Sequence, residues 1–265
     1  MNTRNKLAFV AILSSSLMLH AERIEEQREY TFDLSSPHAI ALKVEDSNIK
    51  VEGTNEDSIY VEIERSVDAR SKAKGHAILE QLGSKIAEHA NKLEIESPLT
   101  AMKNPHKKAH FRETITIRTP YQTELSIKTE DGNVVLKKLS GDIKIKAEDG
   151  NVACHDFSGF LEAKLEDGNL KGKRFSGTIT AKLEDGDAYL HFVDTPEESC
   201  YLKAGDGNIS LDLDKDCHVR LEMKTKDGNI DSNYETILTK TDETKEPHKN
   251  VSISLKTEDG NITIN

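Results

Sequence analysis

The stretch KTEDGNV, at residues 128–134, decides the fold because it recurs through the chain. Copies read KAEDGNV from Lys146, KLEDGNL from Lys164, KLEDGDA from Lys182, KAGDGNI from Lys203, KTKDGNI from Lys224, KTEDGNI from Lys256 and, more weakly, KVEDSNI from Lys43. From Asp131 onward, successive Asp residues are separated by 18, 18, 18, 21, 21 and 32 residues. Periods of this length are typical of a solenoid, in which each repeat is one coil.

A second punctuation lies midway through each regular period, at Ser140-Gly141, Ser158-Gly159 and Ser176-Gly177. Each period therefore holds two short strands and two turns. Between the turns, apolar and polar residues alternate, as a strand with one buried face requires.

Aligning the periods places apolar residues in columns. These are Leu125/Ile143/Leu161/Ile179, Ile127/Ile145/Ala163/Ala181, Thr129/Ala147/Leu165/Leu183, Val134/Val152/Leu170/Ala188 and, near the second turn, Leu139/Phe157/Phe175/Val193. Asp-Gly also favours two-residue hairpins, so an antiparallel meander is the alternative. Columns of like residues favour parallel stacking. We predict an all-β chain built as a right-handed parallel β-solenoid, with one amphipathic helix in an N-terminal insert.

The repeated turn is interpreted first as a structural corner. Gly132 and its equivalents are expected to accept positive φ, and the Asn side chains to hydrogen-bond as a ladder. The predicted structural turn residues are Asp131, Gly132, Asn133, Asp149, Gly150, Asn151, Asp167, Gly168, Asn169, Asp206, Gly207, Asn208, Asp227, Gly228, Asn229, Asp259, Gly260 and Asn261.

The sequence divides into four regions. Residues 1–21 have a basic start and a short apolar run, typical of a signal peptide. Residues 22–57 hold the first strands and the weak first coil, 58–120 a strand-helix-strand insert or cap, and 121–265 the regular repeats. We therefore predict an exported protein, periplasmic, cell-surface or secreted, without a transmembrane helix in the mature chain.

The insert and the C-terminus are expected to form the two ends of the stack. Residues 58–66, 92–97 and 112–120 alternate like strands, and 71–92 reads as an amphipathic helix with Ile86 on its apolar face. The insert would cover one end of the coils. At the other end, Asn261–Asn265 would form an uncapped edge suited to self-association, after a polar loop at 239–250.

The Asp-Gly-Asn-[Val/Ile] coils, the N-terminal strand copy and the strand-helix-strand insert resemble a bacterial family of β-strand-repeat proteins. Members of that family are called "putative adhesins", and their function is unknown. The resemblance spans roughly residues 30–265. It implies an exported or membrane-tethered solenoid, and it supplies no catalytic residues. This chain lacks both the transmembrane helix and the lipobox cysteine that would tether it.

Calcium is the minority interpretation of the turns, because carboxylates are its preferred ligands and Asp-rich repeats bind it in β-rolls. The candidate ligands are Glu130, Asp131, Glu148, Asp149, Glu166, Asp167, Glu184 and Asp185. Only one of the two turns in each coil is acidic, and a Lys stands three residues before the Asp in every copy. A solvated acidic row balanced by Lys is therefore favoured, and no cofactor is expected.

Catalytic residues in a repeat protein are expected where the repeat is broken. The departures are Asp187, Tyr189, His155 and His191, of which the two His share a column with Lys137 and Lys173. We interpret this column as a basic outer stripe. A polysaccharide-acting β-helix enzyme is the least favoured alternative, and His106 with His110 is a weak zinc candidate.

The cysteines and the charge complete the expectations. Cys200 and Cys217 are the candidate disulfide pair for an oxidising compartment, and Cys154 falls in an inward column as a buried thiol. The net charge of −11 argues against nucleic acid as a partner. We predict a non-catalytic scaffold or adhesin-like binding protein of the cell envelope, whose partner is an envelope protein or polysaccharide.

Overall fold

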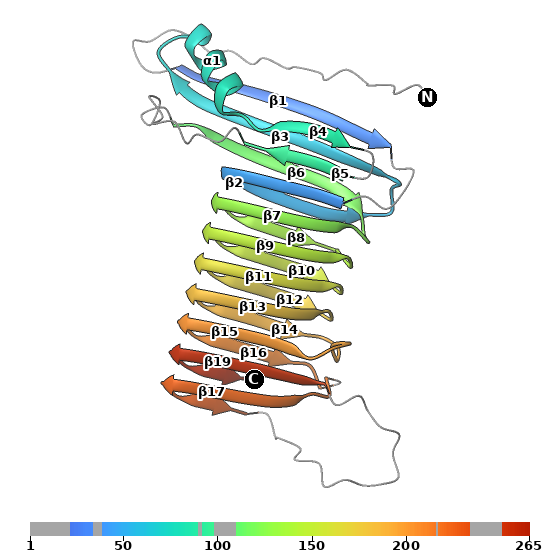
Figure 1. Cartoon of the computed structure of the whole chain (residues 1–265), viewed down its shortest axis with the longest axis vertical. Coiled ribbons are helices and arrows are strands. Elements are labelled where there is room, and N and C mark those ends of the chain that lie inside the picture. The colour runs from blue at the N-terminus through green and yellow to red at the C-terminus, as the bar shows by residue number, and fades with distance from the viewer. Residues whose placement is uncertain (1–21, 34–38, 90–91, 98–109, 216, 234–250) are drawn as a thin grey trace.

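The computed structural model describes residues 22–33, 39–89, 92–97, 110–215, 217–233 and 251–265. These residues form a tall stack of strands with a broader N-terminal cap at one end (Figure 1). The predicted signal segment, residues 1–21, and the polar loop at 239–250 lie outside the described residues.

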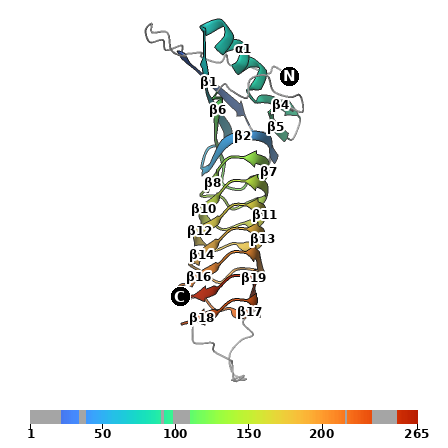
Figure 2. The ribbon, with the colours of Figure 1, turned by 90° about the vertical axis from the view of Figure 1, so that its left-hand side faces the viewer.

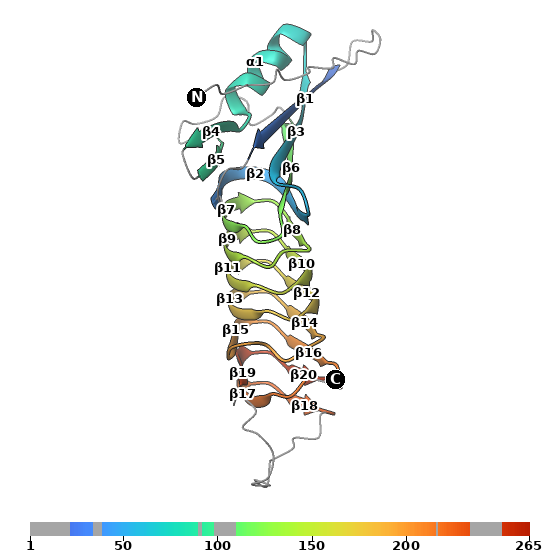
Figure 3. The same ribbon diagram turned by 90° about the vertical axis from the view of Figure 1, so that its right-hand side faces the viewer.

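The stack has two walls that face each other (Figures 2 and 3). The odd wall, in stacking order, consists of β7 (Glu124–Asp131), β9 (Asp142–Asp149), β11 (Phe160–Asp167), β13 (Thr178–Asp185), β15 (Cys200–Asp206), β19 (Ser252–Asp259) and β17 (Arg220–Asp227). The even wall consists of β8 (Val134–Lys137), β10 (Val152–Phe157), β12 (Leu170–Phe175), β14 (Ala188–Phe192), β16 (Ile209–Leu213), β20 (Ile262–Ile264) and β18 (Ile230–Ser232).

Neighbouring strands in both walls are parallel and pair like residue with like. Leu125 pairs with Ile143, and Ile143 with Leu161, with each of them at most 3% exposed between the walls. The Asp of each turn likewise pairs with the Asp of the next coil. The parallel β-solenoid is therefore confirmed, and the antiparallel meander is excluded for the repeats.

The second corner of each coil differs from expectation in one column. Phe157 stacks on Phe175 with ring centroids 5.1 Å apart, and Phe175 meets Phe192 edge-on at 5.3 Å. We expected Val193 in this column, but an irregular register between β12 and β14 places Phe192 there instead. The aromatic ring fills the corner between the walls, and Val193 is only half-buried.

The same corner has a backbone conformation that the sequence does not predict. Lys138, Asp156 and Arg174 have φ of 53°, 54° and 54°, in the left-handed region that side chains disfavour. These residues stand just before the corner's apolar residue, 18 positions apart. Each coil thus repeats the same backbone kink, which swings Leu139, Phe157 or Phe175 into the core.

The cap extends both walls from a single bent strand, β2 (Ala39–Thr54). Its first half pairs with β5 (Lys92–Glu96) and β7, and its second half pairs with β6 (Arg112–Pro120) and β8. Three antiparallel strands complete the cap: β4 (Lys85–His89) on β5, β3 (Ser58–Ala69) on β6, and β1 (Glu22–Asp33) on β3. The cap therefore covers the first coil along both walls.

The helix is shorter than predicted. α1 covers only Lys72–Leu82, capped by Ser71, and it packs Ile78 and Leu79 on β1 and β3. Gly83 ends the helix in an extended conformation, and Ile86 lies in β4 instead of on the helix. The apolar residues between 78 and 86, which the sequence pattern assigned to one helix, are therefore divided between α1 and β4.

The order of the last coils corrects the prediction of an uncapped C-terminus. The C-terminal coil, β19 and β20, is inserted between the coil of β15 and β16 and the coil of β17 and β18. Figure 1 shows the C-terminus beside β19, above β17. Ile262 and Ile264 are fully buried, whereas Ile230 is 45% exposed. The end of the stack is therefore formed by residues 220–232, not by Asn261–Asn265.

Candidate functional site

The repeated turn brings successive backbones into close contact, and this explains its glycines. A Cβ on Gly150 would lie 2.2 Å from the carbonyl oxygen of Gly132, and one on Gly168 would lie 2.1 Å from that of Gly150. Only Gly132 and Gly186 among the described glycines have φ in the positive region, 146° and 147°. The expectation of positive φ at every turn was therefore wrong, and backbone proximity is the general reason.

The Asn side chains of the turns form a ladder of amide hydrogen bonds along the stack. Asn151 Nδ2 donates to Asn133 Oδ1 at 3.0 Å, and Asn169 Nδ2 donates to Asn151 Oδ1 at 2.9 Å. Asp187 interrupts the ladder, since its carboxylate accepts from Asn208 Nδ2 at 3.1 Å but has no proton to donate to Asn169. The ladder therefore ties the corners of neighbouring coils together.

The turn carboxylates form a second column, the Asp row. In stacking order it contains Asp46, Asp131, Asp149, Asp167, Asp185, Asp206, Asp259 and Asp227. Desolvation, followed by repulsion from Asp131 and Asp167, raises the pKa of Asp149 above its usual 3.8. Desolvation, followed by repulsion from Asp131, raises the pKa of Asp46 as well.

Lysines stand beside this row, as the sequence indicated. Lys146 Nζ lies 3.5 Å from Glu166 Oε1 in the next coil, and Lys203 Nζ lies 2.7 Å from Glu258 Oε1. Among the described residues, no group of three or more His, Cys, Asp or Glu is placed to hold a metal ion. The side chains around the row are exposed, so each of these ion pairs contributes little to stability.

The outer face of the even wall carries a basic column, consisting of Lys137, His155 and Lys173. His155 pairs in register with Lys137 on one side and Lys173 on the other. Desolvation and then these two ammonium groups lower the pKa of His155 below 6.5. Lys171 extends the positive charge on a neighbouring position, whereas Arg174 is paired with Asp156, with 2.6 Å between Nε and Oδ1. The column is therefore an exposed cationic stripe in which the central imidazole is neutral at pH 7.

Further down the same face the charge becomes acidic, where the repeat is broken. The Tyr189 hydroxyl donates to the Asp212 carboxylate, and this hydrogen bond is the first cause of a raised Tyr189 pKa. His191 Nε2 lies 2.9 Å from Asp214 Oδ1, with both side chains partly exposed. Lys171 Nζ lies 5.6 Å from the centroid of the Tyr189 ring. The polar groups of these residues are therefore paired with one another on the outer face of the wall.

A buried ionic network in the cap was missed from the sequence. Arg65 Nε donates to Glu113 Oε2 at 2.9 Å, and their side chains are 2% and 0% exposed. Glu113 also accepts from the backbone N–H and hydroxyl of Ser84 and from the hydroxyl of Ser47. Arg65 and Glu113 lie opposite each other in the pairing of β3 with β6. The alternating pattern of each strand does not reveal this, because it does not give the register of the pair. The network fixes β2, β3, β6 and the end of α1.

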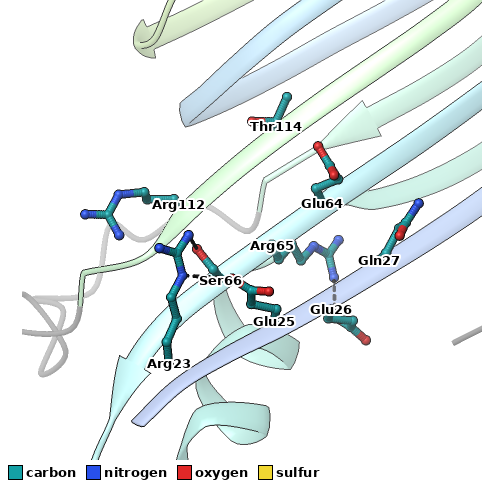
Figure 4. Close-up of a pocket in the computed structure, with 9 residues that line it drawn as sticks. All are labelled: Arg23, Glu25, Glu26, Gln27, Glu64, Arg65, Ser66, Arg112 and Thr114. Atoms are coloured by element: carbon teal, nitrogen blue, oxygen red, sulfur yellow. Dashed lines mark hydrogen bonds and ion pairs between the residues drawn. The ribbon is translucent and has the colours of Figure 1, made fainter. Parts of the chain in front are cut away.

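Beside this network lies a cavity of about 290 Å³ (Figure 4). It is lined by Arg23, Glu25, Glu26, Gln27, Glu64, Arg65, Ser66, Arg112 and Thr114. Arg23 is engaged with Glu25 at 2.9 Å and with Ser66 at 3.3 Å. Three guanidinium and three carboxylate groups thus line the cavity in balance.

All three cysteines are buried and none is in a disulfide, so the predicted Cys200–Cys217 pair is not joined in the structure. Cys217 Sγ donates to the Asp194 carbonyl at 2.9 Å, and Cys200 Sγ lies 3.5 Å from the Ile179 backbone nitrogen. Burial raises the pKa of Cys154 and of Cys217 to about 12, and that of Cys200 to about 11. Cys154 lies between Leu136 and Gly172, as predicted.

Two remaining sequence features find no site. His110 is exposed, and its proposed zinc partner His106 lies outside the described residues. The helix among the described residues has 11 residues, and none there is long and apolar enough to cross a membrane.

The sequence matches the family described as Toastrack DUF4097 over residues 38–171 and again over residues 142–265. These two overlapping segments run from the first coil to the last residue. No protein of curated function matches the sequence.

Solved structures similar to this chain come from several bacteria. A "putative cell adhesion protein" from Clostridium sporogenes is 12% identical, with a TM-score of 0.42 over 91% of this chain and 98% of its own. A "putative adhesin" from Bacteroides fragilis is 12% identical, with a TM-score of 0.45 over 90% and 97%. A "putative lipid binding protein" from Parabacteroides distasonis is 14% identical, with a TM-score of 0.37 over 91% and 96%.

Proposed function

This chain belongs to the Toastrack DUF4097 family, and we propose that it is a non-catalytic scaffold of the cell envelope that binds an acidic polysaccharide. The observation that carries the proposal is the basic column on the outer face of the even wall. The two walls hold this face flat, and the hydrogen-bonded strands space its charges regularly.

A linear polyanion suits this surface better than the other partners considered. Its charges recur along one line, as do the ammonium groups of Lys137 and Lys173 on either side of His155, and the parallel register keeps that line straight. The whole chain carries a net charge of −11, which opposes long-range attraction of any polyanion, an acidic polysaccharide included. Binding is therefore short-ranged and strongly weakened by salt.

The absence of catalysis is part of the proposal. The groups that break the repeat, Tyr189 and His191, are each engaged with a neighbouring carboxylate on an open face. Hydrolysis or elimination of a glycan needs a polarised acid and base around an enclosed bond, and this exposed pair of contacts offers neither enclosure nor a paired carboxylate geometry.

The test is binding of residues 22–265 to polygalacturonate, with dextran as the uncharged comparison, by isothermal titration calorimetry at low and physiological salt. We expect binding to polygalacturonate alone, reduced at least tenfold by the double variant Lys137→Glu/Lys173→Glu. The matched control, Lys146→Glu/Lys182→Glu, makes the same charge change on the odd wall and should leave binding unchanged.

Three results would overturn the proposal. Equal losses in both double variants would mean that net charge, not the basic column, governs binding. Release of reducing ends from the bound polysaccharide would show an enzyme. If an acidic envelope protein is captured while polygalacturonate fails to bind, the partner class is a protein and the polysaccharide assignment is wrong.

Calcium binding at the Asp row is the second candidate, favoured by one observation. Desolvation and then repulsion from Asp131 and Asp167 raise the pKa of Asp149, and a divalent cation would relieve the repulsion. We propose instead that the Asp row is structural, because Lys side chains already form ion pairs with the Glu carboxylates next to this row.

Export is the remaining part of the proposal, supported by the basic and apolar segment at residues 1–21. Mass spectrometry of the chain expressed in full in a bacterial host would measure its N-terminus and its compartment. We expect a chain that begins at Glu22, outside the cytoplasm. An intact Met1 in the cytoplasmic fraction would contradict export.

A further inference from the structure

The basic column has a histidine at its centre. His155 pairs in register with Lys137 on one side and Lys173 on the other, so the three side chains lie on three successive strands of the even wall. Successive strands are about 4.8 Å apart, which places the two lysine positions about 10 Å apart with the imidazole between them. Both lysines are exposed, and His155 is half-buried. A ligand that contacts both ammonium groups therefore passes over the imidazole.

The charges around His155 give the imidazole a positive environment. The carboxylate that favours the imidazolium is Asp156, and it is already paired with Arg174, with 2.6 Å between Asp156 Oδ1 and Arg174 Nε. Lys171, on β12, adds a further ammonium group. Desolvation and then the two column lysines lower the pKa of His155 below 6.5. The free column therefore carries two positive charges at neutral pH, with a third position that takes up a proton in acid.

We propose that His155 couples binding of the anionic polymer to pH, because its protonated ring is the third cationic contact of the bound chain. This inference rests on the proposed function, since it assigns a role within the same column. The negative groups of a bound polymer offset the repulsion from the two lysines, and this favours the charged imidazolium. Binding therefore takes up a proton at His155, and affinity rises as the pH falls.

Protonation and binding strengthen each other. If the protonated column binds the polymer tenfold more tightly than the column with a neutral imidazole, binding raises the pKa of His155 by about one. The polymer keeps its own charge at pH 5.5, because ordinary carboxyl pKa values lie below about 4.5. The extra affinity is therefore fully present below the pKa that His155 has in the free chain. It is lost as the pH rises through the higher pKa of the complex.

A second histidine on the even wall supplies an internal comparison. His191, on β14, pairs in register with Asp212, and its Nε2 lies 2.9 Å from Asp214 Oδ1. Carboxylates of the chain thus already stand where the anionic group of a ligand would lie. The chain has 10 His residues, and protonation of any of them makes its net charge less negative. Replacing His191 therefore separates this general effect from the local effect of His155.

The test is isothermal titration calorimetry of residues 22–265 with polygalacturonate at pH 7.5 and pH 5.5, at one low salt concentration. We expect the parent to bind about tenfold more tightly at pH 5.5. His155→Gln, which is neutral at both pH values, should keep the parent's affinity at pH 7.5 and lose most of the gain in acid. His155→Lys, which is charged at both, should bind tightly at both. His191→Gln is the matched control and should keep the pH dependence of the parent.

Nuclear magnetic resonance of the His155 ring measures the same coupling directly. We expect the pKa of His155 to rise when polygalacturonate is added. A pKa that stays unchanged in the complex overturns this inference, and so does a His155→Gln variant with the pH dependence of the parent. In both cases, polygalacturonate binding that depends on the two column lysines would still support the proposed function. A parent that binds at neither pH overturns the proposed function and this inference together.

Discussion

At the residue scale, the stack is governed by how closely the turn backbones approach. Gly150 must stay a glycine because a Cβ would lie 2.2 Å from the Gly132 carbonyl oxygen, an atom fixed in the neighbouring coil. A side chain there forces two coils apart along the stacking direction. Glycine is thus required at this corner by packing more than by backbone conformation.

We expect Gly150→Ala, and more strongly Gly150→Val, to destabilise the chain by about 2–3 kcal/mol, the usual cost of forced overpacking. Gly172→Ala is the matched control, because its Cβ would meet only the movable Cδ2 of Leu190, at 2.5 Å. Urea denaturation of the three variants checks this. Equal stability of the Gly150 and Gly172 variants would count against the backbone-contact explanation.

The Asp row makes a second prediction, for pH. Desolvation and then repulsion raise the folded-state pKa of Asp149 above 3.8, so the folded chain binds this proton more tightly than the unfolded chain does. The penalty is therefore present at neutral pH and disappears as the pH falls through the raised pKa toward 3.8. We expect Asp149→Asn to melt at a higher temperature than the parent at pH 7 but not near pH 3.5. A pH-independent difference would contradict this.

At the element scale, the cap depends on one buried ion pair. Arg65 and Glu113 join β3 to β6 across the interior, while Ser84, just after α1, binds both of them. Removing one partner leaves the other charged and enclosed. This makes the strand-helix-strand insert a single unit rather than a set of separate coverings.

Glu113→Ala should therefore cost about 3–5 kcal/mol, as expected for breaking a buried pair. The double variant Arg65→Met/Glu113→Leu removes both charges and should recover much of that loss. Chemical denaturation of the two variants, followed by circular dichroism, measures the difference. If the double variant is as unstable as Glu113→Ala, the cost lies in packing and not in the unpaired Arg65.

Element by element, the sequence was most informative where like residues repeat. Period and alternation are enough to place Ile143 on Leu125 and Cys154 between Leu136 and Gly172, because parallel stacking aligns equal positions. The left-handed φ of Asp156 and the bulge that brings Phe192 onto Phe175 were beyond prediction, since they depend on the backbone path at the corner. Arg65 and Glu113 have no local signature, because their encounter needs strand register.

At the scale of the whole molecule, the acidic turns are expected to serve the stack without a metal. Calcium titration of residues 22–265, followed by thermal melting, checks this. We expect a β-rich chain without calcium and no calcium-specific rise in melting temperature, because Lys203–Glu258 and similar pairs already neutralise the turn face. A sharp rise absent with magnesium would mean that calcium binds the folded state.

The inserted C-terminal coil makes the last prediction, on hydrogen exchange. Chain order alone would leave Asn261–Asn265 at the frayed end, whereas the structure places β19 and β20 between two neighbours and gives β17 one neighbour among the described residues. We expect residues 253–264 to exchange slowly. Leu221, Met223 and Thr225 should exchange fast, because their N–H groups face the side away from β19. The measurement is residue-resolved hydrogen exchange. Faster exchange in 253–264 than in 220–227 would contradict the coil order.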